Sequence, residues 1–249
     1  SDLIGYFFYK NLIVVLPQIW IAVATGFSGQ VVYEPFIFEF YNICFTSIPV
    51  LIYAIWDRQF DLDLLQNAPS FYKIGPNREM FNTRHLFQRW IGRAAMQSFL
   101  ICFFAFFMIE YNFVSNGLLH DFWTTGMAVF TAVIIVANLE LFNIHNSHST
   151  ITYFFIFGSI GIYVIVLTVF SSFKSNPLYM CLYRLLVTPN FYIFLFTVIY
   201  ICSVFVSSVH KIMHLMDKIH FKRISSPEGI RRRNSSFYRR QYTGFAYSG

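Results

Sequence analysis

The chain opens with LIGYFFYKNLIVVLPQIWIAVA, residues Leu3–Ala24, in which Lys10 is the only charged residue. Five more stretches with few charges follow it: Pro35–Trp56, Trp90–Ile109, Trp123–Leu141, Ile151–Phe170 and Asn190–Val209. A helix that crosses a bilayer needs about 20 mostly apolar residues. The sequence therefore predicts an all-α fold, a polytopic membrane protein with six transmembrane helices and a basic cytosolic C-terminal tail.

Two other fold classes fit the composition less well. Charged residues make up 12% of the chain and apolar residues 56%, whereas soluble domains carry about 25% charged residues. A soluble all-helical protein would need six buried helices that are longer than such helices usually are. A β-barrel would show alternating rather than continuous apolar residues.

Cysteine and histidine give no sign of a metal site. The four cysteines lack the spacing of metal ligands, so we expect four free thiols. His145 and His148 are three residues apart, but no third ligand of the usual kind lies near them in the sequence. The sequence therefore predicts no metal site.

Hydropathy and charge divide the chain into four regions. They are 1–56, the first two spans with their polar motifs; 57–89, a cytosolic loop; 90–210, four further spans; and 211–249, a cytosolic regulatory tail. Most Lys and Arg residues lie in the loop, its flanks and the tail, whereas the loops on the opposite side hold only Lys174 and Arg184. Cytosolic segments carry the excess of basic residues. We therefore expect an integral, multi-pass protein of the plasma membrane or an endomembrane, with both ends of the chain in the cytosol.

Lys10 lies about 10 Å into the first span, at 1.5 Å per residue. A charge at the centre of a membrane helix costs about 2.5–3.5 kcal/mol on insertion scales, and less near its end. In one interpretation the lysine stem runs along the helix and brings the ammonium to the interface. In the other, Lys10 faces a polar pathway through the membrane.

Each of the first two spans contains a proline. Pro17 and Pro49 have no backbone N–H, so the carbonyls of Ile13 and Phe45 lose their usual helical partners. Irregular backbone at membrane depth is tolerated only beside protein or a water-filled cavity. Three polar residues lie near the second proline: Asn42, Thr46 and Ser47. This combination favours a transport path, although Pro49 alone also fits a kinked, packed helix.

Three sequence blocks carry a resemblance to a known family. Phe7-Phe8-Tyr9-Lys10-Asn11 resembles the Phe-Tyr-Lys-Asn motif in the fifth span of the lipid-flippase class of P-type ATPases. Gly26-Phe27-Ser28-Gly29-Gln30 resembles the outer turn that follows that span, and the run from Tyr41 to Val50 resembles the sixth span. The blocks occur in family order and spacing, so the chain looks like spans five to ten of such a phospholipid-transporting ATPase.

The resemblance implies a flippase that uses ATP to move phospholipid from the outer to the cytosolic leaflet. In the family, the positions that match Lys10, Asn11 and Asn42 are associated with the path of the lipid headgroup. Thr46 and Ser47 complete the expected substrate-binding set, because their hydroxyls lie in the same irregular segment. An ammonium, amides and hydroxyls suit a headgroup phosphate or carboxylate, while the acyl chains stay in lipid.

The resemblance also implies cofactors and partners. ATP and Mg²⁺ would be bound by cytosolic domains outside this chain, which lacks the Asp-Lys-Thr-Gly phosphorylation motif and holds no catalytic residue. Because Ser1 stands directly before an apolar run, we expect the chain to be a piece of a longer protein. Expected partners are the rest of the same ATPase and a two-span glycosylated accessory subunit that contacts the loops Glu110–Phe122 and Ser171–Pro189. We expect no nucleic-acid partner.

The tail contains two possible regulatory elements. Three arginines, Arg231–Arg233, precede Ser235 in a pattern typical of a basophilic kinase site, although they also fit a polybasic patch on anionic lipid. The residues Gly244, Phe245, Ala246, Tyr247 and Ser248 resemble a Gly-Phe-Ala-Phe-Ser element with which some flippase tails block the nucleotide-binding region. We expect tail autoinhibition that phosphorylation or phosphoinositide binding relieves.

Two other functions remain open from the sequence. The chain would also fit a flippase-like regulatory membrane domain fused to another catalytic module, such as a cyclase. It would equally fit a passive channel or scramblase made of these six spans alone. An Asp-Lys-Thr-Gly motif upstream of this segment would favour the pump, and lipid movement without ATP would favour the passive protein.

Overall fold

The computed structural model describes residues 2–57, 83–110, 121–145, 150–204 and 208. These residues are helical apart from turns and short connections, and no strand occurs among them. The helices belong to one compact unit, Ser1–Ser203. The predicted all-α class is therefore confirmed. The residues proposed for regulation, Ser235 and Gly244–Ser248, lie outside the described residues.

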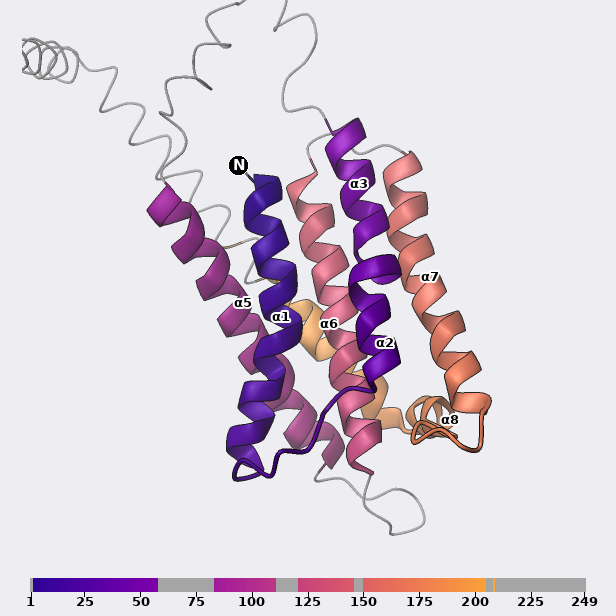
Figure 1. Cartoon of the computed structure of the whole chain (residues 1–249). Coiled ribbons are helices and arrows are strands. Elements are labelled where there is room, and N and C mark those ends of the chain that lie inside the picture. The colour runs from indigo at the N-terminus through magenta and orange to yellow at the C-terminus, as the bar shows by residue number, and fades with distance from the viewer. Residues whose placement is uncertain (1, 58–82, 111–120, 146–149, 205–207, 209–249) are drawn as a thin grey trace, which may run out of the picture. The chain divides into compact units, whose positions relative to one another are not determined.

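The helices follow one another along the chain as up-and-down rods (Figure 1). Their bounds are α1 Asp2–Ala24, α2 Pro35–Phe40, η1 Tyr41–Phe45, α3 Ser47–Trp56, α5 Thr83–Ala105, η3 Phe106–Glu110, α6 Phe122–Ile144, α7 Thr150–Ser172 and α8 Cys181–Val187. A further helix, Pro189–Val204, follows α8. Here η marks a π-helical segment, in which each turn is one residue wider than in an α-helix.

The described helices supply five or six membrane spans. Five are long and apolar enough to cross a bilayer: Leu3–Ala24, Pro35–Trp56, Trp90–Ile109, Phe122–Ile144 and Thr150–Ser172. The sixth would be the pair α8 and Pro189–Val204, which bend by 82° relative to each other. The prediction of a polytopic membrane protein is thus confirmed. The first three spans match the predicted windows, and the end of the sixth window lies outside the described residues.

The third span is part of a longer helix than its apolar window suggested. Helix α5 begins at Thr83, so residues 83–89, which we assigned to the loop 57–89, are helical. A hydropathy window ends where polar residues begin, whereas a helix can continue past the edge of the bilayer.

The proline in the first span does not interrupt its helix, because Pro17 lies within a continuous α1. The irregular backbone expected from proline is therefore confined to the second span.

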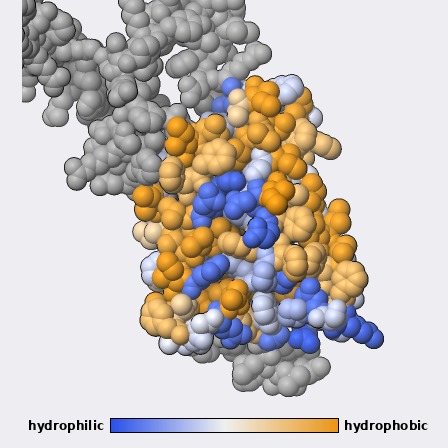
Figure 2. All heavy atoms as spheres, in the orientation of Figure 1, coloured by the Kyte–Doolittle hydropathy of each residue, from blue (hydrophilic) through white to orange (hydrophobic). Residues whose placement is uncertain are grey.

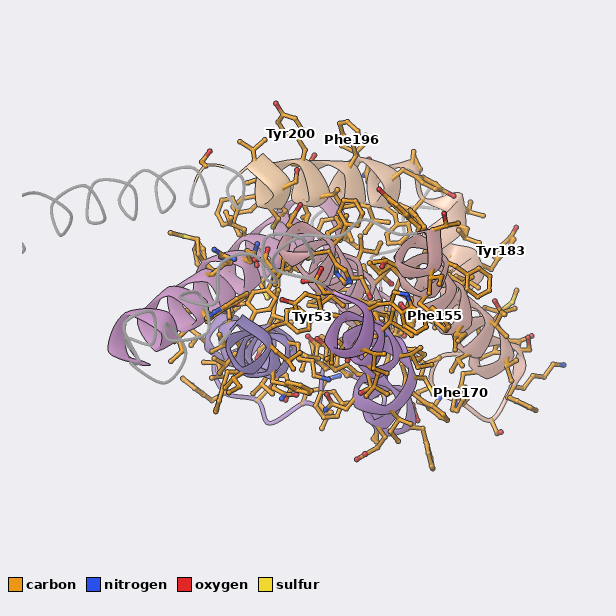
Figure 3. All side chains as sticks on the ribbon, turned by 90° about the horizontal axis from the view of Figure 1, so that it is seen from above. Tyr53, Phe155, Phe170, Tyr183, Phe196 and Tyr200 are labelled. Atoms are coloured by element: carbon orange, nitrogen blue, oxygen red, sulfur yellow. The ribbon has the colours of Figure 1, made fainter. Side chains whose placement is uncertain are left out.

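Helix α6 lies at the centre of the bundle. It contacts α1, α3, α5, α7 and α8. Its small residues Ala128, Ala132 and Ala137 have no exposed surface, which allows the neighbouring helices to approach closely. Viewed from above in Figure 3, Tyr53 points into the bundle, whereas Phe196 and Tyr200 point away from it. Exposed aromatic side chains on the outside of the bundle suit a helical protein in lipid.

Hydrogen bonds between side chains add to this packing. Trp20 Nε1 donates to Ser98 Oγ over 3.0 Å and joins α1 to α5. Tyr6 donates its hydroxyl proton to the Ala137 carbonyl over 3.0 Å and joins α1 to α6. The cysteines Cys44, Cys102, Cys181 and Cys202 are all free thiols, as predicted.

A close backbone approach fixes the connection between the first two spans. A Cβ atom at Gly126 of α6 would overlap the carbonyl oxygen of Val32, which lies just before α2. At Gly158 of α7, by contrast, a Cβ atom would meet nothing within 4 Å. The connection can therefore lie against α6 only because residue 126 has no side chain.

We predict that Gly126→Ala lowers the free energy of unfolding by about 1–3 kcal/mol, the usual cost of overpacking. Thermal melting in detergent would show this as a lower Tm. Gly158→Ala is the matched control and should leave Tm unchanged or slightly raised, since alanine favours helix. Equal melting of the two variants would contradict the close approach.

Candidate functional site

Lys10 of α1 lies inside the bundle and contacts the second span. Its side chain is only 2% exposed, and Nζ donates to Thr46 Oγ1 over 3.2 Å. The ammonium also lies 5.2 Å from the centre of the Phe7 ring. The ion pair found among the described residues joins Arg93 and Glu140, so no described carboxylate neutralises Lys10. The ammonium is therefore held by a neutral hydroxyl on a neighbouring span.

Tyr41 ties the backbone of the two spans together at the same place. Its hydroxyl donates to the carbonyl oxygen of Lys10 over 2.7 Å. The Thr46 hydroxyl donates its proton to the Tyr41 carbonyl over 2.8 Å. A lone pair on the same oxygen therefore accepts the hydrogen bond from the Lys10 ammonium. Tyr41 and Thr46 are buried. Lys10, Tyr41 and Thr46 thus form a closed set of contacts, which we call the lysine ring.

The lysine ring depends on an irregular segment of the second span. Residues Tyr41–Phe45 form the π-helical segment η1, and Thr46 has φ −131° and ψ −21° before α3 resumes the α-helix. The wider turn separates α2 from α3 and directs the Thr46 hydroxyl back over the Tyr41 carbonyl. π-Helical turns of this kind are frequent at functional sites.

Asn11 and Asn42 present exposed amides next to the lysine ring. Asn11 Nδ2 donates to the Phe7 carbonyl over 3.0 Å within its own helix. The Asn42 carbonyl accepts from the hydroxyl of the half-buried Ser47. Figure 2 shows hydrophilic side chains gathered on this face, between α1 and the second span, with apolar side chains around them.

The structure therefore divides the predicted substrate-binding residues into two groups. Lys10 and Thr46 are brought together inside the bundle. Asn11 and Asn42 lie on the outer surface, and Ser47 stabilises the turn. Sequence reasoning missed Tyr41, whose phenol supplies the contact with the α1 backbone. A tyrosine within a run of apolar residues gave no separate signal.

A second buried polar cluster lies beside the first span and was not predicted. Arg93 of α5 forms an ion pair with Glu140 of α6, and its guanidinium lies 5.0 Å from the Trp90 ring. Tyr9 donates its hydroxyl proton to Gln97 of α5. The only sequence signal was the presence of opposite charges near the ends of two spans, and no spacing rule joins residues that lie so far apart in the chain.

The described residues contain no group of three or more His, Cys, Asp or Glu side chains placed to hold a metal ion. His145 is buried, and its ring packs 4.8 Å from Tyr53, centre to centre. His148, the other half of the histidine pair, lies outside the described residues.

Comparison with known proteins agrees with this membrane architecture. The family described as "Phospholipid-translocating P-type ATPase C-terminal" matches residues 1–217. The chain is 34% identical over 166 residues to human phospholipid-transporting ATPase IG and 32% identical over 165 residues to mouse phospholipid-transporting ATPase IH. Each alignment covers 66% of this chain but only 14% of the relative's length.

A more distant relative gives the same result. Phospholipid-transporting ATPase DRS2 of Saccharomyces cerevisiae is 29% identical over 174 residues, which cover 69% of this chain and 13% of that protein. The family match ends at residue 217 and so does not include Ser235 or the segment 244–248.

We predict that Arg93→Met destabilises the protein by about 3–5 kcal/mol, because it leaves the Glu140 carboxylate buried without its partner. A melting curve in detergent should show the loss. The double variant with Arg93→Met and Glu140→Leu should recover most of it, since no buried charge remains. A double variant as unstable as the single one would show that packing, rather than the ion pair, matters here.

Proposed function

This chain belongs to the phospholipid-translocating P-type ATPases, and on that premise we propose that it forms the membrane part of an ATP-driven phospholipid flippase. In this proposal the enzyme moves phospholipid from the outer to the cytosolic leaflet. The alignments cover 14% of the length of relatives named phospholipid-transporting ATPases. ATP and Mg²⁺ would be bound by cytosolic parts of the same enzyme.

The observation that supports this proposal most is the ammonium of Lys10, buried beside Thr46 without a carboxylate among the described residues. An ammonium carries three donors, and the contact with Thr46 uses one. A phosphate or carboxylate of a lipid headgroup would satisfy the other two and neutralise the charge. A buried charge is costly unless it is paired, so an anionic group at this place would be favoured.

Asn11 and Asn42 would mark the opening of the path towards Lys10. Both residues are exposed, on a face where hydrophilic side chains gather between apolar ones. Amides donate and accept hydrogen bonds without carrying charge, which suits the phosphate and polar groups of a headgroup that passes along the surface. The acyl chains would remain in the bilayer, in contact with exposed apolar residues such as Phe7 and Ile43.

The orientation follows from the same proposal. The N-terminal end of α1 and the tail would lie in the cytosol, as the distribution of basic residues favours. The segment Ser171–Pro189 would then face outwards, where an accessory subunit would bind. Phe173 supports such a contact, because it follows the end of α7 and is 58% exposed. The loop Glu110–Phe122 lies mostly outside the described residues.

We predict that Lys10→Ala in the complete ATPase raises the phospholipid concentration for half-maximal ATPase stimulation at least about tenfold. The variant loses a charge-assisted contact with the headgroup, and about 1.4 kcal/mol corresponds to a tenfold change in affinity. Lys174→Ala, which removes an exposed lysine from the turn after α7, is the control and should behave like the wild type.

Half-maximal stimulation at the wild-type concentration in Lys10→Ala would contradict the assignment of Lys10 to the lipid path. Lipid movement by the wild-type enzyme in the absence of ATP would instead support a passive scramblase.

We predict that removing residues 225–249 from the complete ATPase raises its basal ATPase rate several-fold, because the tail no longer occupies the nucleotide-binding region. Replacing only Phe245 and Tyr247 with alanine should reproduce most of the increase. An unchanged rate in both variants would exclude autoinhibition by the tail.

A further inference from the structure

The irregular turn of the second span leaves one backbone carbonyl in need of a partner. Pro49 has no N–H, so it cannot donate to the carbonyl of Phe45, four residues before it. Both residues are buried within the span. An unpaired carbonyl in this position would be costly, because no water is available in the bilayer core to replace the missing donor.

Asn138 of α6 supplies the missing donor. Its Nδ2 donates to the Phe45 carbonyl over 3.2 Å and to the Ile134 carbonyl of its own helix over 2.9 Å. Its Oδ1 accepts from Ser159 Oγ of α7 over 3.1 Å. Asn138 is fully buried and Ser159 is 1% exposed. The side chain thereby links the second span to both α6 and α7.

The carbonyl that Asn138 holds is next to the lysine ring. Thr46 follows Phe45 directly, and its φ of −131° depends on where the Phe45 peptide points. The Phe45 ring also packs against Tyr163 of α7, edge-on at 5.2 Å between ring centres. Fixing the Phe45 carbonyl therefore also fixes the direction of the Thr46 hydroxyl towards Lys10.

We propose that Asn138 is a positioning residue of the lipid path. It takes the place of the N–H that Pro49 lacks, and so keeps the π-helical turn in the shape that brings Thr46 to Lys10. Asn138 is fully buried, and its hydrogen bonds among the described residues go to Phe45, Ile134 and Ser159 rather than to the lysine ring, so it acts through the backbone of the second span. This inference rests on the proposed function, because the functional quantity that it should change is the stimulation of ATPase activity by phospholipid.

The test is Asn138→Leu in the complete ATPase, since leucine has a similar size but cannot donate a hydrogen bond. The phospholipid concentration for half-maximal stimulation should rise about fivefold, as expected for the loss of one buried hydrogen bond. The maximal rate should change less. In the Thr46→Val variant, adding Asn138→Leu should raise this concentration little further, because both substitutions affect the contact between Thr46 and Lys10.

Ser98→Ala is the control. It removes another hydrogen bond between helices, in which Trp20 Nε1 of α1 donates to Ser98 Oγ of α5 over 3.0 Å, and neither residue forms a hydrogen bond with the described residues of the second span. Lipid dependence in this variant should match the wild type. If Asn138 merely joined helices, Asn138→Leu and Ser98→Ala would lower Tm alike and leave the half-maximal lipid concentration unchanged, and that result would overturn the proposal.

Ser159→Ala provides a milder variant if Asn138→Leu does not fold. It removes only the hydroxyl that orients Asn138, and should raise the half-maximal lipid concentration about twofold. Wild-type lipid dependence in Ser159→Ala would then overturn the proposal.

Amide hydrogen exchange separates this inference from the proposed function. The amides of residues 41–48 should exchange faster in Asn138→Leu, or in Ser159→Ala, than in the wild type and Ser98→Ala. If the wild-type enzyme showed no lipid stimulation, the proposed function would fail and exchange alone would decide whether Asn138 holds the turn. Unchanged exchange would exclude that role.

Discussion

The structure depends on one constraint, that every backbone polar group inside a bilayer needs a partner within the protein. Continuous α-helices without proline meet it by themselves, and α6 and α7 do so over 23 residues each. The second span does not, because it contains a π-helical segment and Pro49. Side chains of other helices complete its hydrogen bonds, and this requirement brings polar groups together at the site.

The polar contacts of the second span point in two directions. On one side, Tyr41 and Thr46 meet the backbone and ammonium of Lys10. On the other, Phe45 meets Asn138, which is held by Ser159. A helix of regular geometry would direct its side chains elsewhere and would need neither set of contacts. The irregular turn therefore joins what we propose to be the lipid path to the centre of the bundle.

The sequence was sufficient to predict the membrane spans, whereas the substrate path in the first two spans stays a prediction. Apolar length marked the long helices but not α8, which lies within the predicted loop Ser171–Pro189. Lys10 was conspicuous as a charge within a span, and Pro49 correctly indicated irregular backbone. Pro17 looked equivalent but lies in an uninterrupted helix. The contacts of Tyr41, Asn138 and the pair Arg93–Glu140 could not be predicted, because they join residues far apart in the chain through geometry that hydropathy does not encode.

The most direct measurement of the central claim is an experimental structure of the complete ATPase with phospholipid bound. Our account predicts a phosphate or carboxylate oxygen of the headgroup within about 4 Å of Lys10 Nζ, the range of an ion pair, with Asn11 and Asn42 beside it. A headgroup bound elsewhere, with Lys10 still on Thr46 and no anionic group near it, would contradict the account.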